Sequence, residues 1–232
     1  MENNIHILCT GTLNKLLVEE VEEAGIDIEE LPFIITESIQ SIAFQQEIEL
    51  EFLQTATVVF TSMNAVEAVA FYQEENRPAW DIYCIGTSTN KLVGNYFGHE
   101  KIAGTADDAT SLAELIVEDE VTNEVIFFCG DQRRDELPRI LRNHDIEVNE
   151  ITVYRTIAVP HKIGRLFHGI LFFSPSAVES FFQHNKLPGT TILFAIGNTT
   201  AKEISKHSSN KTILGDEPGK ASLVNKMVEY FT

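Results

Sequence analysis

Positive charge is scarce in this sequence, and its scarcity excludes several kinds of partner. The 232 residues contain 17 Lys and Arg against 35 Asp and Glu, a formal net charge of −18. A nucleic-acid surface needs a basic stripe to neutralise phosphates, and an anionic membrane attracts basic segments. We therefore expect neither nucleic acid nor membrane as a partner. A cleft can still be locally positive on an acidic protein and bind a small anion.

Cysteine and long apolar runs are also sparse. The three cysteines (Cys9, Cys84 and Cys129) lie within or at the ends of short apolar runs, which is typical of reduced core residues in a cytoplasmic protein. No run reaches the ~18 apolar residues of a membrane span, and residues 1–4 do not begin like a secretory signal. We expect a cytoplasmic protein without disulfides.

Motifs for nucleotide, zinc-protease or hydrolase chemistry are absent. The sequence has no G-x-G-x-x-G, Walker A, H-E-x-x-H or nucleophile-elbow pattern. Its seven histidines show no spacing typical of metal ligands. We therefore expect no metal site.

Short apolar runs alternate with amphipathic stretches along the chain. Near-continuous apolar runs are typical of parallel strands covered on both faces. The predicted strands are Ile5–Cys9, Thr57–Phe60, Ile82–Ile85, Val125–Cys129, Ile170–Phe173, Ile192–Ile196 and Thr212–Leu214. Polar turns and helical patterns follow them, so the sequence predicts an α/β fold with parallel sheets flanked by helices.

An internal repeat divides this pattern into two similar lobes. Three strand–turn–helix segments recur in order, Val58–Glu67 at Ile170–Glu179, Ile85–Lys91 at Ile196–Lys202, and Ser111-Leu112 at Ser222-Leu223. Two further segments pair in the opposite chain order, Cys9 with Cys129 and Gly25–Leu31 with Asp145–Ile151. The copies are therefore circularly permuted, with the second lobe inserted in the first.

The repeat predicts where the chain crosses between lobes. Lobe one comprises residues 1–34 and 158–232, and lobe two comprises residues 40–152. Residues 35–39 and 153–157 form the two crossings, which we expect to pair as a two-stranded β linker. Because two strands alone are only marginally stable, we expect the lobes to move relative to each other.

Polar turns follow matching strands of both lobes. They are Thr61–Asn64, Gly86–Thr89, Gly130–Arg134, Ser174–Ser176 and Gly197–Thr200. For a single Ser or Thr, capping of the following helix explains the residue well. Taken together, helix N-termini beyond the carboxyl ends of strands predict a cleft for a ligand with several carboxylates or phosphates.

Three side chains can be interpreted as either functional or structural. Arg133 and Arg134 are predicted to open a helix, where the helix dipole disfavours cations, so they either contact a carboxylate or serve the structure. Tyr154 lies in the return crossing. Its phenol either donates a proton to a leaving group or packs on the linker.

The chain resembles the uroporphyrinogen-III synthase family over essentially its whole length. The resemblance is carried by Ile151–Thr156, Phe172–Val178, Ala195–Ala201, Phe60–Ser62 with Asn64–Val66, and Cys129-Gly130 with Arg134 and Leu137-Pro138. It implies the same architecture of two α/β lobes. It also implies cyclisation of hydroxymethylbilane to uroporphyrinogen III in haem biosynthesis, with loss of water, inversion of ring D and no cofactor.

The resemblance also implies roles for individual residues in a cytoplasmic monomer. The family's tyrosine falls on Tyr154, which would assist departure of the hydroxyl. Catalysis would otherwise consist mostly of positioning the chain ends. The eight substrate carboxylates would be held by Thr61, Ser62, Ser88, Gly130, Arg134, Ser174, Ser176, Thr199 and Thr200.

Two turns depart from the family, and two alternatives to a synthase stay open. Cys9–Thr12 stands where many members have an arginine-containing turn, and Met63-Asn64 replaces a frequent Pro-Arg. Both changes remove positive charge. The alternatives are a non-catalytic, hinged cytoplasmic module that binds a small polycarboxylate, and a flavodoxin-like cofactor carrier. The lack of a glycine-rich phosphate loop argues against the carrier.

Overall fold

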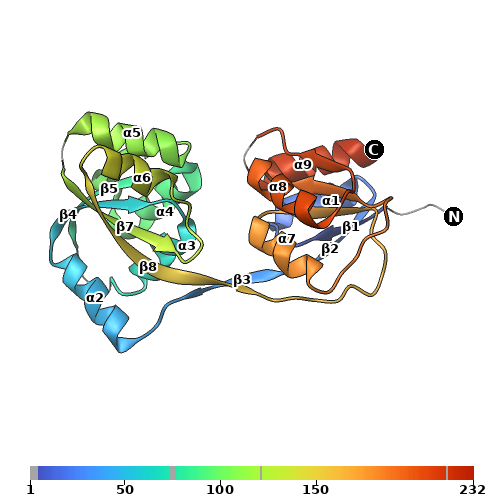
Figure 1. Cartoon of the computed structure of the whole chain (residues 1–232), viewed down its shortest axis with the longest axis horizontal. Coiled ribbons are helices and arrows are strands. Elements are labelled where there is room, and N and C mark those ends of the chain that lie inside the picture. The colour runs from blue at the N-terminus through green and yellow to red at the C-terminus, as the bar shows by residue number, and fades with distance from the viewer. Residues whose placement is uncertain (1–4, 74–76, 121, 218) are drawn as a thin grey trace. The chain divides into compact units, whose positions relative to one another are not determined.

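A computed structural model describes residues 5–73, 77–120, 122–217 and 219–232. The chain divides into two compact units, unit 1 with residues 1–35 and 157–232 and unit 2 with residues 36–156. In each unit, helices flank a sheet whose core strands are parallel (Figure 1). The predicted α/β class is therefore confirmed.

Unit 1 contains a five-stranded sheet in the order β11-β10-β9-β1-β2. Its strands are β1 (Ile5–Cys9), β2 (Ile26–Glu30), β9 (Gly169–Phe172), β10 (Ile192–Ala195) and β11 (Thr212–Leu214). Its helices are α1 (Lys15–Glu23), α7 (Pro175–Phe182), α8 (Asn198–His207) and α9 (Lys220–Phe231).

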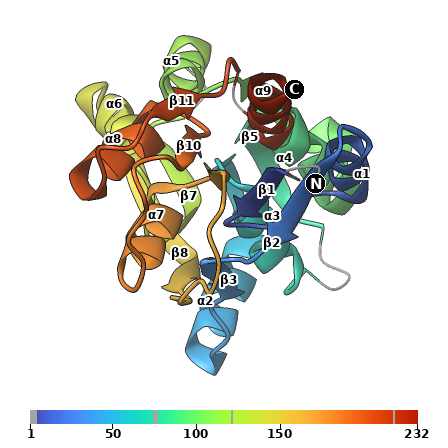
Figure 2. The ribbon, with the colours of Figure 1, turned by 90° about the vertical axis from the view of Figure 1, so that its right-hand side faces the viewer.

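The core of unit 1 has two apolar layers because side chains alternate between the faces of a strand. On one face Leu8 packs with Phe181 of α7 and Ile204 of α8. On the other, Ile7 packs with Val21 of α1 and Val224 of α9. Figure 2 shows α7 and α8 on one side of the unit 1 sheet and α1 and α9 on the other.

Unit 2 contains a six-stranded sheet in the order β3-β8-β7-β4-β5-β6. Its strands are β3 (Ile34–Ser38), β4 (Thr55–Phe60), β5 (Ala79–Ile85), β6 (Ile102–Ala106), β7 (Glu124–Gly130) and β8 (Glu147–Ala158). Its helices are α2 (Ile42–Phe52), α3 (Met63–Ala70), α4 (Gly86–Phe97), the 3-10 turn η1 (His99–Lys101), α5 (Ala109–Asp119) and α6 (Glu136–Asn143).

The same layering holds unit 2 together. Phe60 and Phe128 pack with α2, α3 and α4 on one face of the sheet. Val59 and Phe127 pack with α5 and α6 on the other.

None of the helices in the described ranges has both the length and the apolar character needed to cross a membrane.

The strand orders of the two sheets correspond in the permuted sense that the repeat predicts. The order β11-β10-β9-β1-β2 of unit 1 matches β6-β5-β4-β7-β8 of unit 2. The two crossing segments are paired, as β3 and β8, and the backbone N–H of Ile39 donates to the carbonyl of Val153 at 2.9 Å. Strand β8 is 12 residues long and carries Tyr154 directly after Val153 of this pairing.

Candidate functional site

Polar residues meet where neighbouring strands of unit 2 end. Strands β8, β7 and β4 are adjacent in the sheet. Gly130 is the last residue of β7 and lies opposite Tyr154 of β8, while Ser62 follows β4 and caps α3. Carboxyl ends of parallel strands share one edge of a sheet, so residues far apart in the sequence come together there.

A hydrogen bond joins Tyr154 to Ser62. The Tyr154 hydroxyl donates to Ser62 Oγ at 3.2 Å, and the same oxygen accepts the backbone N–H of Asn64, also at 3.2 Å. The Tyr154 side chain is half-buried and packs on the core beneath the turn. A hydroxyl that accepts two hydrogen bonds keeps its own proton for a further acceptor. Ser62 can therefore bind Tyr154 and a ligand oxygen together.

Gly130 makes room for the tyrosine ring. A Cβ atom at Gly130 would lie 2.4 Å from Tyr154 Cζ and 2.7 Å from its hydroxyl oxygen, closer than real Cβ contacts. The β7–β8 register also shifts between Cys129 and Gly130, and the Asp131 N–H donates to the carbonyl of Tyr154 at 3.1 Å. The ring thus crosses the end of β7 to reach the turn after β4.

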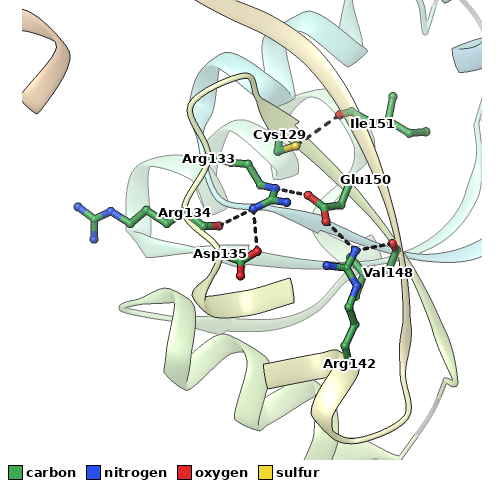
Figure 3. Close-up of polar contacts among 8 residues, drawn as sticks. All are labelled: Cys129, Arg133, Arg134, Asp135, Arg142, Val148, Glu150 and Ile151. Atoms are coloured by element: carbon green, nitrogen blue, oxygen red, sulfur yellow. Dashed lines mark hydrogen bonds and ion pairs between the residues drawn. The ribbon is translucent and has the colours of Figure 1, made fainter. Parts of the chain in front are cut away.

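The prediction that Arg133 and Arg134 open a helix is wrong, because both lie in the turn between β7 and α6. Helix α6 begins at Glu136, so neither Arg133 nor Arg134 opens it. Arg133 forms ion pairs with Glu150, through Nε, and with Asp135 Oδ1 at 3.0 Å (Figure 3). Glu150 also pairs with Arg142 at 2.6 Å. The role of Arg133 is therefore structural, and it ties its turn to β8.

The guanidinium groups of the two arginines in this turn point in different directions and differ in their exposure to solvent. Burial lowers the pKa of Arg133, but hydrogen bonds and charge from Glu150 and Asp135 outweigh that effect and leave the pKa above its usual range. Arg133 is thus permanently charged and engaged with the protein's own acids. The Arg134 side chain is exposed and points away from this ion-pair cluster (Figure 3).

The turn after β5 supplies Ser88. Helix α4 starts at Gly86, whose φ of +72° suits glycine, and no side chain caps its first backbone N–H groups. Ser88 lies exposed in the first turn of the helix. Strand β5 neighbours β4 in the sheet, so this helix start belongs to the same edge as Ser62.

Unit 1 has its own polar turns at the carboxyl ends of β9 and β10. Ser174 caps α7 by accepting the N–H of Ala177 at 3.1 Å, and Ser176 is half-buried in the first turn of that helix. In the turn after β10, Thr199 is exposed whereas Thr200 is 1% exposed. Thr200 therefore packs inside the unit, and Thr199 is the threonine that reaches solvent.

Sequence reasoning missed Lys220, the first residue of α9. Its Nζ donates to the carbonyl of Thr12 at 2.6 Å and lies 5.2 Å from the centroid of the Phe173 ring. Within the described residues it forms no ion pair with an acid. The structure therefore places a cation beside the Cys9–Thr12 turn, which lacks the arginine frequent in the family. The sequence signal that could have pointed to Lys220 is its place directly after Gly219, at the start of a predicted helix.

The described residues contain neither a cluster of metal ligands nor a reactive thiol. The ranges that the structure describes contain no group of three or more His, Cys, Asp or Glu side chains able to hold a metal ion. All three cysteines are buried and free. Burial raises the pKa of the Cys9 thiol to about 12 and that of Cys129 to about 11. Both thiols stay protonated near neutral pH and are poor nucleophiles.

Two sequence comparisons point to one family. The model of the family described as uroporphyrinogen-III synthase HemD matches residues 15–225. A relative from Saccharomyces cerevisiae, named uroporphyrinogen-III synthase, is 26% identical over 175 residues. That match covers 64% of this chain and 64% of the yeast protein, so the chain spans just under two thirds of that relative's length.

Two solved structures share the fold. A mutant uroporphyrinogen III synthase from Thermus thermophilus gives a TM-score of 0.67 at 14% identity, covering 97% of this chain and 98% of that one. The uroporphyrinogen-III synthetase of Helicobacter pylori 26695 also gives 0.67, at 15% identity, covering 97% and 99%. At such identities the likeness concerns the fold alone.

Proposed function

The chain belongs to the uroporphyrinogen-III synthase family, and we propose that it converts hydroxymethylbilane to uroporphyrinogen III in haem biosynthesis. The reaction is a lyase step that needs no cofactor. It breaks the C–O bond of the terminal hydroxymethyl group, releases water, inverts ring D and closes the macrocycle. Beyond the family match, the observation that carries this proposal is the Tyr154–Ser62 hydrogen bond held across Gly130. The family match leaves a non-catalytic binding module without support.

Tyr154 acts as the acid in this proposal. Its phenol donates a proton to the leaving hydroxyl, which departs as water. The Ser62 hydroxyl, which accepts the phenol's hydrogen bond at rest, then turns to donate to the phenolate oxygen. The terminal methylene carbon then bonds to the ring D carbon that already carries the chain, which gives a spiro intermediate. The older bond between that carbon and the chain breaks and re-forms at the unsubstituted α-carbon of ring D. That α-carbon loses its proton, and the proton restores the phenol. The reaction thus releases one water and leaves Tyr154 unchanged.

The polar turns bind the substrate's carboxylates in this proposal. In unit 2 these residues are Thr61, Ser62, Ser88, Gly130 and Arg134; in unit 1 they are Ser174, Ser176, Thr199 and Lys220. Lys220 supplies the cation that the turn after β1 lacks. Thr200 supports the turn after β10 from inside the unit, because it is buried.

We place this reaction in the cytoplasm and assign it to a monomer. Three buried, unpaired thiols suit a reducing compartment. The formal net charge of −18 argues against nucleic acid and anionic membranes as partners. The partner in this proposal is therefore a small molecule, the linear tetrapyrrole itself.

The assay that tests the function separates the isomers of the product. Freshly prepared hydroxymethylbilane, incubated with the full chain, is expected to yield the type III isomer. The type I isomer forms spontaneously by closure without ring inversion, so a reaction that yields only type I contradicts the proposal.

Tyr154→Phe tests the acid role. Losing the proton donor is expected to slow formation of the type III isomer by about 10²-fold, with no change in the thermal unfolding midpoint. Tyr96→Phe is the matched control, because Tyr96 is an exposed tyrosine of α4. Equal rates in wild type and Tyr154→Phe would remove Tyr154 from the acid role.

Ser62→Ala tests whether the serine orients the phenol. The change removes both a helix cap, which costs about 1 kcal/mol of stability, and the acceptor for Tyr154. We expect turnover to fall about tenfold. Ser41→Ala separates the two effects, because Ser41 caps α2 by accepting the N–H of Phe44 and shares no hydrogen bond with Tyr154 in the described part of the chain. If Ser41→Ala slows the reaction as much, the loss comes from stability and the positioning role is wrong.

A further inference from the structure

A cavity in unit 1 collects positive charge away from the polar turns. Its volume is about 250 Å³, and its walls are residues 162–167, residues 184–188 and Thr191. These segments precede β9 and β10, so the cavity lies at the amino ends of these strands. The proposed substrate contacts of unit 1 lie at the opposite ends.

The charge of the cavity walls differs from that of the chain as a whole. Lys162, Arg165 and Lys186 line the cavity, His184 joins them, and no lining residue is an Asp or Glu. In the whole sequence acids outnumber Lys and Arg by 35 to 17. Asp27 and Glu29 pair with Arg165 but do not line the cavity, so an anion there meets lysine ammonium groups at close range.

Buried polar side chains hold the two walls together. Asn185 is 6% exposed; its Oδ1 accepts the N–H of Ile163 at 2.9 Å, and its Nδ2 donates to the carbonyl of His161 at 2.7 Å. Thr191 is 1% exposed and donates to the carbonyl of Phe167 at 2.9 Å. These bonds fix the stretch before β9 to the stretch before β10, so the protein's own hydrogen bonds hold the cavity walls in place.

The three cations are engaged to different degrees. Arg165 lies 2.9 Å from Glu29 Oε2 and 3.3 Å from Asp27 Oδ2, and its guanidinium lies 4.9 Å from the centroid of the Phe167 ring. It is thus held by the protein. Lys162 and Lys186 form no ion pair or side-chain hydrogen bond within the described residues. Their two ammonium groups are the ones available to an incoming anion.

We propose that this cavity binds a small organic anion, a carboxylate or sulfonate on a compact apolar body. Lys162 and Lys186 pair with the anionic group, and Phe167, Ile163 and Leu187 contact the apolar body. Pockets for drug-sized ligands usually measure ~300–1,000 Å³, so about 250 Å³ suits a ligand of one or two rings. A four-ring tetrapyrrole is too large, which separates this site from that of the proposed reaction.

The test is an NMR titration of the ¹⁵N-labelled full chain with 2-naphthoate at low ionic strength. Saturable shifts are expected for the backbone amides of residues 162–167 and 184–187. Lys162→Gln/Lys186→Gln is expected to weaken binding at least about tenfold. Lys91→Gln/Lys101→Gln, two lysines of unit 2 with the same change in charge, is expected to leave it unchanged.

Two further probes test the chemical class of the ligand. The uncharged 2-naphthylmethanol is expected to bind at least about tenfold more weakly than 2-naphthoate, and inorganic phosphate is expected to compete poorly because it cannot use the apolar wall. The proposal is overturned if the cavity amides do not shift, if the lysine variant binds as wild type does, or if the alcohol or phosphate binds as well as naphthoate.

Discussion

At the scale of single residues, an absent side chain decides where the key phenol lies. Gly130 does not adopt a left-handed conformation. It matters because it lacks a Cβ atom, and the Tyr154 ring occupies the space that a Cβ would fill above β7. Because protein interiors are close-packed, one added methyl group at such a contact moves its neighbours. The neighbour here is the ring that carries the proposed acid.

Gly130→Ala is expected to lower both stability and turnover. The new Cβ would lie 2.4 Å from Tyr154 Cζ, so the ring must leave Ser62, and overpacking costs about 1–3 kcal/mol. Chemical denaturation and the isomer assay measure the two effects. Gly189→Ala is the control, because a Cβ there meets nothing within 4 Å. If the phenol is the affected group, Gly130→Ala should cost less stability in a Tyr154→Ala background.

Some of the site residues could be predicted from the sequence and others could not. Tyr154, Ser62 and Gly130 stood out by residue type and place, but their mutual contact depends on the strand order β8-β7-β4, which the chain order does not give. The sequence left open whether Arg133 contacts a ligand or serves the structure, because its partner, Glu150, lies 17 residues further along the chain on β8. Lys220 escaped notice because it approaches the first turn of the chain from the last helix.

At the scale of elements, burial on both faces decided which strands could be predicted. The seven apolar runs predicted as strands correspond to β1, β4, β5, β7, β9, β10 and β11, and their bounds agree with the structure to within three residues. Strand β8 was predicted only over residues 153–157 and in the structure extends over Glu147–Ala158, because its polar residues alternate with apolar ones. Strands β2 and β6 were missed. Both are short and carry polar or small residues, β2 as Ile-Asp-Ile-Glu-Glu and β6 as Ile-Ala-Gly-Thr-Ala. Both are edge strands, and neither has the continuous apolar run by which the edge strand β11 could be predicted.

The start of α7 allows capping and substrate binding to be tested separately. Ser174 accepts the N–H of Ala177, and Asn, Asp and Ser cap helices about equally well. Ser174→Asn and Ser174→Asp should therefore both unfold near the wild-type midpoint. Only Ser174→Asp adds a charge that repels a substrate carboxylate, so we expect its KM to rise about tenfold while that of Ser174→Asn changes little. Equal KM values for the two variants would confine Ser174 to capping.

At the scale of the whole molecule, duplication and charge act together. The two units repeat one order of strands, so each presents polar helix starts at the carboxyl edge of its sheet. Such starts attract anions through backbone N–H groups and the helix dipole. These local attractions have a range of a few ångströms, whereas the formal net charge of −18 acts over a longer distance. An approaching polyanion is therefore repelled before it is bound.

This balance predicts an unusual response to salt. The Debye length falls from ~30 Å at 0.01 M to ~8 Å at 0.15 M ionic strength, so added KCl screens the long-range repulsion more than the close contacts. We expect kcat/KM for hydroxymethylbilane to rise about twofold or more over that range, with kcat at saturation nearly constant. Initial rates at substrate concentrations well below KM measure the effect. A steady fall in kcat/KM would mean instead that Arg134 and Lys220 attract the substrate from a distance, and Lys220→Gln should then flatten the salt dependence.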